Sequence, residues 1–431
     1  CFDTVTSPQL VAKHGFYPFI HCTMTTRKVK NGQKAPAKER EIYYAAHLDG
    51  WIYRYYAFLL DQAYNRRAAA DGIDSVAVAY RTDLGECNVD FAKKAFHFIQ
   101  ELDACYVMIG DFTNFFDTLD HAYLKRQLCS LLSDRLVDGR LPDDYYAIFK
   151  NITRFSFVEL TELLQLKGYE NTKSGRKAFN DRQNIPVIPI SEIRKSNIPI
   201  CRNPRKGKGI PQGSPISAVL ANVYMLDADK QLQEYVTSHD GFYMRYSDDF
   251  IVILPKDSGD FFAHRQRIKA IISAAKVDLQ PEKTRVYLYE NTTVVNLTAQ
   301  FEGNEFSHNK NLIEFLGFSF DGKIVRFRDK TISKYYNRMY RKARVIAQNR
   351  SNPNVKRRIG CKNLYMRHSK KGSLYYRKKT KTFDPSDKKN RRGNFFDYVQ
   401  RSKNIFEGAL VDTVTPRHMQ KINRALKRPF Q

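Results

Sequence analysis

The chain has 431 residues, with 72 Lys and Arg against 45 Asp and Glu, and therefore a formal net charge of +27 at pH 7. A hydrophobic fraction of 42% and a content of 29 Phe, 26 Tyr and 1 Trp exclude a disordered basic tail, because such tails lack apolar surface to bury. An uninterrupted apolar run of about 18 to 20 residues is also absent, which excludes a membrane-spanning helix.

The seven cysteines are dispersed and form no CxxC pair, so the sequence offers no zinc knuckle. This pattern is typical of free thiols in a reducing compartment. Because the N-terminus also shows no basic and apolar leader, we expect a cytoplasmic protein without a membrane partner.

The first segment with chemical character is an apolar run, residues 105–112, that predicts a buried strand ending at Asp111. A helix is expected from about Thr118, and Asp117 or Asp120 could serve as its N-cap. A carboxylate at the end of a buried strand is costly unless a cation or hydrogen bonds satisfy it. Asp111 is therefore a candidate metal ligand.

A glycine- and proline-rich loop, Gly209–Ser217, follows and leads into an apolar helix that Ser214 or Ser217 could cap. Basic residues that could meet phosphates precede it. They are Arg202, Arg205, Lys206 and Lys208.

Residues 242–254 predict a hairpin of two apolar arms with Ser247, Asp248 and Asp249 at its tip. Adjacent carboxylates repel one another, and a divalent cation relieves that repulsion. Together with Asp111 they make a hard-oxygen ligand set that suits two Mg²⁺ ions, with Mn²⁺ as the alternative ion, and that suggests nucleotidyl transfer. Taken alone, each segment is also compatible with ordinary turn or cap residues.

The net charge is concentrated at the C-terminal end of the chain. Residues 1–321 carry 40 basic and 39 acidic side chains, whereas residues 322–431 carry 32 and 6. Such a sector is typical of a polyphosphate-binding surface. Residues 332–346 show helical spacing, and residues 351–392 predict a loop.

In this order the segments resemble the motifs of the reverse-transcriptase family over residues 37–321. Asp111–Phe116 resembles motif A, Gly209–Ser217 motif B, Tyr246–Asp249 motif C, Leu279–Thr284 motif D and Phe315–Phe318 the primer grip. The resemblance implies an α+β, right-hand polymerase fold. The implied division is an N-terminal extension (1–36), fingers (37–104), a first palm segment (105–144), a fingers insertion (145–208), a second palm segment with the primer grip (209–321) and a helical basic thumb (322–431).

The resemblance also implies roles. Asp111, Asp248 and Asp249 would be the catalytic metal ligands, assisted by the Phe112 carbonyl. Phe116 would be the steric gate that favours deoxynucleotides. The expected nucleotide-binding set is Phe116 with Arg81, Gln212, Lys283, Lys38 and Arg40; the last two could equally face solvent, and Lys283 could be a surface residue in a turn. The primer grip would be Phe315, Leu316 and Gly317, and the nucleic-acid contacts would be Arg202, Arg205, Lys206, Lys208, Lys334, Tyr335, Arg338 and Arg341.

Within the family, the chain most resembles the bacterial unknown-group and abortive-infection branch, especially the compact defence-associated enzymes of class 2. The segments that carry this likeness are residues 79–81, 88–92, 318–323 and 332–336. That likeness implies a structured non-coding RNA template, dNTP substrates, an RNA–DNA hybrid product and an antiviral role. Retron-type or intron-type enzymes are other branches. The alternatives in function are a catalytically silent RNA-binding effector and an RNA-dependent RNA polymerase, which Phe116 disfavours.

Overall fold

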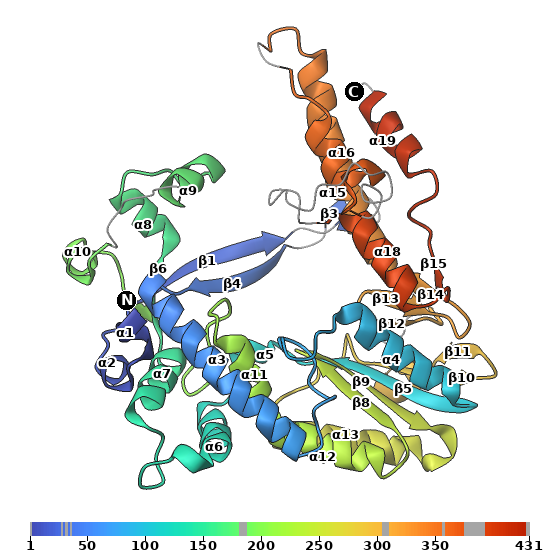
Figure 1. Cartoon of the computed structure of the whole chain (residues 1–431), viewed down its shortest axis with the longest axis horizontal. Helices are drawn as coiled ribbons and strands as arrows, with labels where there is room; N and C mark the ends of the chain where they lie inside the picture. The colour runs from blue at the N-terminus through green and yellow to red at the C-terminus, as the bar shows by residue number, and fades with distance from the viewer. Residues whose placement is uncertain are drawn as a thin grey trace.

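The computed structural model describes residues 2–26, 29–30, 33–34, 37–180, 188–303, 310–355, 358–374 and 393–427. These residues form helices and mostly antiparallel sheets, so the predicted α+β class is confirmed. Figure 1 shows a central sheet with helices below and above it, a second sheet beside it, and a group of long helices that rises from one end. No described helix is long and apolar enough to cross a membrane, and the described cysteines are free.

The central sheet has the strand order β11-β10-β5-β9-β8 within the described chain. All its neighbouring strands are antiparallel. Its strands are β5 (Ala104–Asp111), β8 (Phe242–Tyr246), β9 (Asp249–Pro255), β10 (Arg285–Glu290) and β11 (Thr293–Asn296).

This sheet separates two hydrophobic cores, because side chains alternate between its faces. In β9, Phe250, Val252 and Leu254 belong to one core, whereas Ile251 and Ile253 belong to the other. The first core includes helices α11 (Ser217–Tyr224), α12 (Leu226–Thr237) and α13 (Phe261–Ala274), and the second includes α4 (Asn88–Glu101). Burial on both faces explains why this strand is a continuous apolar run.

A second sheet lies on the N-terminal side, in the order β4-β1-β6-β7. Its strands are β1 (Phe19–Thr26), β4 (Lys38–Tyr44), β6 (Ser156–Glu159) and β7 (Cys201–Arg202). Along the chain, a separate two-stranded ribbon, β2 (Val29–Lys30) with β3 (Gln33–Lys34), follows β1 and precedes β4. Because Ile20 to Thr26 pair with Lys38 to Tyr44, the expected boundary after residue 36 falls inside one hairpin.

The helices of this half differ from the sequence prediction in one place. The helix expected from Thr118 is two helices, α5 (Phe115–Thr118) and α6 (His121–Leu131), because the Asp120 side chain caps α6 by accepting from the Tyr123 amide. The others are α1 (Phe2–Thr6), α2 (Pro8–Ala12), α3 (His47–Ala70), η1 (Ser133–Arg135), α7 (Asp143–Thr153), α8 (Leu160–Leu166), α9 (Lys173–Asn180) and α10 (Ile190–Lys195).

The C-terminal region begins as a third sheet, in the order β12-β13-β14-β15. Its strands are β12 (Ile313–Phe315), β13 (Phe318–Phe320), β14 (Val325–Phe327) and β15 (Leu410–Val411). Strands β14 and β15 pair in parallel. Because β13 and β14 pair in antiparallel fashion, Phe318 with Phe327, the expected boundary at residue 322 also falls inside a sheet.

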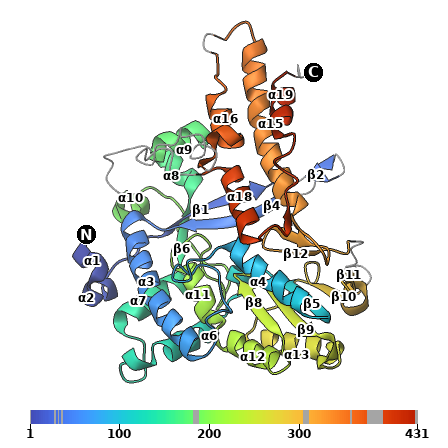
Figure 2. The ribbon, with the colours of Figure 1, turned by 45° about the vertical axis from the view of Figure 1, so that its right-hand side comes forward.

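The long helix α15 (Asp329–Ser351) leaves this sheet and lies beside α19 (His418–Lys427) in both views (Figure 1, Figure 2). Some of the predicted loop at 351–392 is helical, as α16 (Lys362–His368) and η4 (Lys370–Gly372), because Leu364 joins the buried core. Residues 375–392 lie outside the described residues. The other elements are α14 (Thr298–Glu302), α18 (Phe395–Ile405) and η2 (Lys256–Ser258).

Candidate active site

Three aspartates meet at one end of the central sheet. Asp111 is the last residue of β5 and pairs in register with Asp249, the first residue of β9. Asp248 lies in the tight turn between β8 and β9, next to Ser247, whose φ is 64°. The backbone joins the two strand ends, because the Phe112 amide donates to the Asp248 carbonyl at 3.1 Å. The structure therefore places the three predicted aspartates at the same end of the sheet.

A fourth predicted residue, Lys283, also reaches this end. The segment after α13 folds onto the end of β5, where the Gln280 amide donates to the Asp111 carbonyl at 2.8 Å. Three residues later, the Lys283 ammonium donates to Asp111 Oδ1 at 2.6 Å. Asp111 is buried, with 8% of its surface exposed, so this ion pair compensates a carboxylate that would otherwise be costly.

Negative charge is crowded at this site. The pKa of the Asp249 carboxyl is raised to about 7, by partial removal from water and then by the charges of Asp248 and Asp111, while Lys283 acts in the opposite direction. Asp249 is an exposed residue by surface area, so we give more weight to the neighbouring charges than to the loss of water. A cation beside these oxygens would remove that repulsion.

The donor set fits hard divalent cations, which prefer a few carboxylate oxygens and keep sites for water and phosphate. Within the described residues, however, no three His, Cys, Asp or Glu side chains converge as a ready-made metal cage. Instead, the Lys283 ammonium provides the positive charge at Asp111. The carboxylate oxygens thus suit a divalent ion, and in this structure the Lys283 ammonium balances the charge of Asp111.

A buried ion pair supports the turn that carries Asp248. Arg245 in β8 is fully buried and binds Asp229 of α12 through two arms, Nε to Oδ1 at 2.9 Å and Nη2 to Oδ2 at 2.6 Å. Its third nitrogen, Nη1, donates to the Ser247 carbonyl at 3.0 Å and to Asn222 Oδ1 at 3.3 Å. The hairpin tip is therefore fixed from behind by a network spanning α11, α12 and β8.

Sequence reasoning did not identify Arg245, Asp229 or Asn222. One signal was present, because Arg245 is a charge inside the apolar strand at residues 242–254, and a buried charge requires a partner. The identity of that partner depends on how α12 packs under the sheet, which the local sequence does not encode.

The predicted gate residue lies close to the loop at residues 209–217. The Ile210 amide donates to the Phe116 carbonyl at 2.9 Å, and the Phe116 ring is partly exposed next to the buried ring of Phe115. Phe115 is a core residue with 3% exposure. Of the two rings, Phe116 is thus the one that is partly accessible at the surface.

The same loop approaches the N-terminal sheet. Gln212 is half-buried, and its carbonyl accepts from the Tyr43 amide of β4 at 2.8 Å. Gly213 has a φ of 113°, and a Cβ there would lie 3.0 Å from the Tyr43 carbonyl oxygen, so this close approach requires glycine. Neither serine caps α11: Ser217 donates to the Pro211 carbonyl, and the buried Ser214 hydroxyl has no hydrogen-bond partner among the residues that the structure describes.

Arg81 differs from its predicted role, because it does not lie free for a triphosphate. Its side chain is fully buried and bonds to Asp74 and Asp83, each at 2.6 Å through Nη2. The pairing arises because the turn at residues 71–83 brings both carboxylates around one guanidinium. Arg40 is exposed on β4, and the Lys38 side chain lies outside the described residues.

The basic residues before the loop differ in exposure. Arg202, Lys206 and Lys208 are exposed, whereas Arg205 is half-buried and pairs with Asp117 at 3.1 Å. Burial raises the pKa of the Asp117 carboxyl, and Arg205 opposes that shift. Arg205 therefore already has an anionic partner within the protein.

The predicted primer grip is the turn of the β12–β13 hairpin. Leu316 and Gly317 have φ values of 45° and 96°, and Phe315 is buried. The Asn88 side-chain amide of α4 donates to the Leu316 carbonyl at 2.9 Å, which ties this turn to the central sheet. The turn is thereby held in one place relative to α4.

On α15 the predicted nucleic-acid contacts divide into two groups. Lys334, Arg338 and Arg341 are exposed on one side of the helix. Tyr335 is buried at 7% exposure and stacks on Phe395 with ring centroids 4.3 Å apart, so its predicted contact is wrong. The helical period places it on the face that packs against α18.

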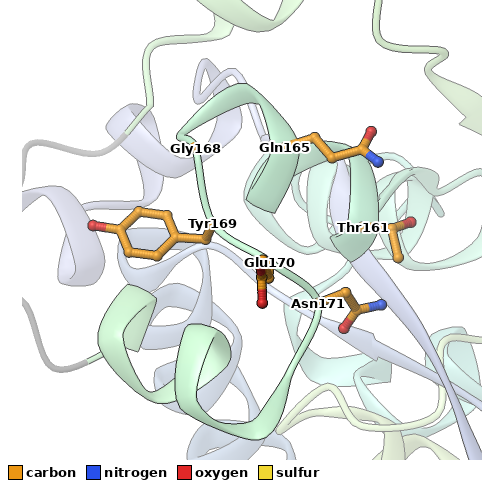
Figure 3. Close-up of a pocket in the computed structure, with 6 residues that line it drawn as sticks. All are labelled: Thr161, Gln165, Gly168, Tyr169, Glu170 and Asn171. Carbon is orange, nitrogen blue, oxygen red and sulfur yellow. The ribbon is translucent and has the colours of Figure 1, made fainter.

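Figure 3 shows a hollow away from these residues, on α8 and the turn that follows it. Its lining residues are Thr161, Gln165, Gly168, Tyr169, Glu170 and Asn171. No predicted site residue contributes to this lining, so the hollow is separate from the aspartates.

Comparison with known proteins gives one family match. Residues 193–320 match the model of the reverse transcriptase (RNA-dependent DNA polymerase) family. The matched region contains Gln212, Asp248, Asp249 and Lys283, and Asp111 joins it through the β5–β9 pairing. The comparison with curated proteins gave no match.

Solved structures with similarity to the chain include telomerases. Apo telomerase from Candida tropicalis truncated from its C-terminal domain is 12% identical with a TM-score of 0.43, over 76% of this chain and 60% of that one. Telomerase from Candida albicans in complex with a fragment of telomeric RNA is 13% identical with a TM-score of 0.42, over 97% and 66%. The chain thus spans less than two thirds of the length of these proteins.

Proposed function

We propose that the chain is an RNA-directed DNA polymerase, a nucleotidyltransferase that copies RNA into DNA, since residues 193–320 match the model of the reverse transcriptase family. The observation that carries this proposal is the meeting of Asp111, Asp248 and Asp249 at paired strand ends, with Lys283 beside them. Clustered carboxylates next to bound nucleic acid have no evident use in a protein that only binds RNA. The silent-effector alternative is therefore disfavoured.

In this proposal Asp111 and Asp248 hold two Mg²⁺ ions, and Asp249 completes the ligand set. The ions would supply charge for the attacking 3′-hydroxyl and the departing pyrophosphate. The buried Arg245 network keeps the Ser247 carbonyl and the adjoining Asp248 in place. Lys283, whose ammonium donates to Asp111 Oδ1, would be the group that donates a proton to pyrophosphate.

The sugar of the nucleotide is selected by Phe116. The loop contact at Ile210 and the packing on Phe115 hold this ring, so a 2′-hydroxyl would meet a rigid phenyl edge. A hydrophobic ring cannot accept the hydroxyl's hydrogen bond, and burying that group unpaired is costly. This supports dNTPs over rNTPs as substrates and disfavours an RNA-dependent RNA polymerase.

The hybrid duplex would be held by the C-terminal region, which carries most of the net charge. Exposed Lys334, Arg338 and Arg341 on α15 give that region a basic side for phosphates. Backbone contacts of this kind suit A-form hybrids, which proteins hold largely by shape.

We further propose that the RNA is a structured non-coding RNA and that the activity serves antiviral defence, as in compact class 2 enzymes of the bacterial branch. The support is the likeness of residues 79–81, 88–92, 318–323 and 332–336 to that branch. Sequencing the nucleic acid that co-purifies with the protein would test this proposal directly. Random cellular RNA without complementary DNA would count against it.

The polymerase proposal is tested by incorporation of labelled dNTPs on an RNA template with an annealed DNA primer, in Mg²⁺. We expect extension by the unaltered protein and none by the double variant Asp248→Asn, Asp249→Asn. The variant Asp257→Asn, with a surface aspartate in η2, is the control and should extend normally. Equal extension by the double variant would overturn the catalytic assignment.

A further inference from the structure

Tyr80 lies directly beside the aspartate hairpin, although nothing in the motifs assigns it a role. Its hydroxyl is hydrogen-bonded to Ser247 Oγ at 3.0 Å, and Ser247 immediately precedes Asp248. The Tyr80 residue is nevertheless 50% exposed. The ring therefore forms part of the surface next to the proposed reaction centre.

The backbone at Tyr80 is in an unfavourable conformation. Its φ is 67°, in the left-handed region that residues with a bulky side chain rarely adopt. A glycine would adopt this conformation without penalty. This position therefore carries a tyrosine although its backbone conformation would favour a glycine.

Flanking residues hold this conformation from both sides. The Asn222 side-chain amide donates to the Ala79 carbonyl at 3.0 Å, and the Val78 amide donates to the Arg245 carbonyl at 3.0 Å. On the other side, Arg81 is buried in its ion pairs with Asp74 and Asp83. The ion pairs of Arg81 thus have a structural role, because they fix the backbone directly after Tyr80.

We propose that the ring of Tyr80 contacts the terminal base pair of the primer–template duplex and holds the primer end at the aspartates. This inference rests on the proposed polymerase function, since the 3′-hydroxyl must then lie at Asp111 and Asp248. Strained residues that neighbouring contacts maintain are concentrated at functional sites. An exposed aromatic ring with a fixed orientation packs on sugars and bases without sequence preference.

The hydrogen bond of the Tyr80 hydroxyl determines which part of the side chain can contact nucleic acid. Because the hydroxyl bonds to Ser247, the ring is fixed and its face and edge remain for the nucleic acid. The contact should therefore stabilise the bound duplex end and not the incoming nucleotide. Loss of the ring should raise the KM for primer–template and speed duplex dissociation, with a smaller effect on the KM for dNTP.

The decisive variant is Tyr80→Gly, which removes the ring and relieves the strained φ. We expect an unchanged or higher melting temperature, together with affinity for a recessed RNA–DNA hybrid that is about tenfold weaker or more, measured by fluorescence anisotropy without dNTP. Tyr80→Phe keeps the ring but loses the bond to Ser247, and should show a smaller loss. Tyr146→Ala, with a 41% exposed tyrosine on α7, is the matched control and should bind normally.

A second measurement locates the contact. The variant Tyr80→p-benzoylphenylalanine, irradiated with the bound hybrid, should crosslink to the last one or two base pairs at the primer end. Crosslinks only elsewhere on the duplex, or unchanged hybrid affinity of Tyr80→Gly, would overturn the inference. The binding and crosslinking readouts do not need catalysis, so an unaltered protein that fails to extend primers would reject the polymerase function separately.

Discussion

Arg245 and Asp229 form an ion pair in which neither side chain is exposed, with two arms of the guanidinium on one carboxylate. Asp229→Asn removes the counter-charge and leaves Arg245 buried alone. We expect the free energy of unfolding to fall by about 3 to 5 kcal/mol, measured by urea denaturation. Asp71→Asn, which breaks pairs with the more exposed Arg67 and Lys230, should cost about 1 kcal/mol or less. Equal losses of unfolding free energy in the two variants would show that burial does not make the Arg245–Asp229 pair more costly to break.

Replacing both partners separates stability from activity. In the double variant Arg245→Met, Asp229→Leu, apolar side chains of similar size fill the space, so stability should recover much of what Asp229→Asn loses. The Ser247 carbonyl still loses its donor, and primer extension should remain impaired. Full recovery of extension would show that the pair stabilises the fold without positioning Asp248.

Lys283→Gln tests the lysine at Asp111. If Lys283 donates a proton to pyrophosphate, kcat should fall by about 10²-fold or more while the KM for primer–template stays near its original value. Lys276→Gln is the control, because that lysine pairs with Asp120 on the surface. A kcat equal to that of the unaltered protein would leave Lys283 only its charge-pairing role.

Phe116→Val opens space beside the sugar of the nucleotide. Discrimination between dNTP and rNTP, taken as the ratio of kcat/KM values, should fall by about tenfold or more. Phe115→Leu, in the buried neighbouring ring, should alter stability and leave sugar selection intact. Unchanged selectivity between dNTP and rNTP in the valine variant would show that Phe116 is not the steric gate.

The exposed cations of α15 should appear in the salt dependence of hybrid binding. Replacing Lys334, Arg338 and Arg341 together by alanine should reduce the slope of log affinity against log salt by about 2 to 3. A triple alanine variant of Lys125, Arg126 and Lys150 on α6 and α7 removes equal charge elsewhere and should leave the slope unchanged. Identical slopes for both variants would place the duplex on another surface.

Acid should destabilise the C-terminal region through His368. Burial, and then the nearby cations Lys342 and Arg367, lower the pKa of this imidazole to about 4 from its ordinary 6.5. The unfolded chain therefore binds a proton more readily than the folded one, and stability present above pH 6.5 is lost as the pH falls towards 4. His368→Gln should flatten this region of the melting-temperature profile, and an unaltered profile would contradict the assignment.

The sequence predicts the position of the three aspartates well, because each lies at the end of a continuous apolar run. Such a run is a local feature that can be read directly from the sequence. Lys283 and Phe116 are expected near this site from the resemblance to the family's motifs, and Lys283 does pair with Asp111. Arg81 and Tyr335 could not be placed correctly, because their burial depends on distant partners: Asp74 and Asp83 around one, and Phe395 against the other. The network of Arg245 is non-local for the same reason.

The expected domain limits after residue 36 and at residue 322 both fall between strands that pair with one another. Motifs mark where chemistry occurs, whereas strand pairing decides which segments fold together. Residues 20–26 pair with 38–44, and β13 pairs with β14, so each limit separates two strands that pair with one another.

The parallel pairing of β14 with β15 also has a consequence for biosynthesis. The sheet that carries the proposed primer grip cannot be completed until residue 411 has left the ribosome, although its first strand begins at Ile313. During that interval the apolar edge of β14 has no partner strand and is a template for wrong pairing. A nascent chain paused between these points is therefore exposed to wrong strand pairing until β15 emerges.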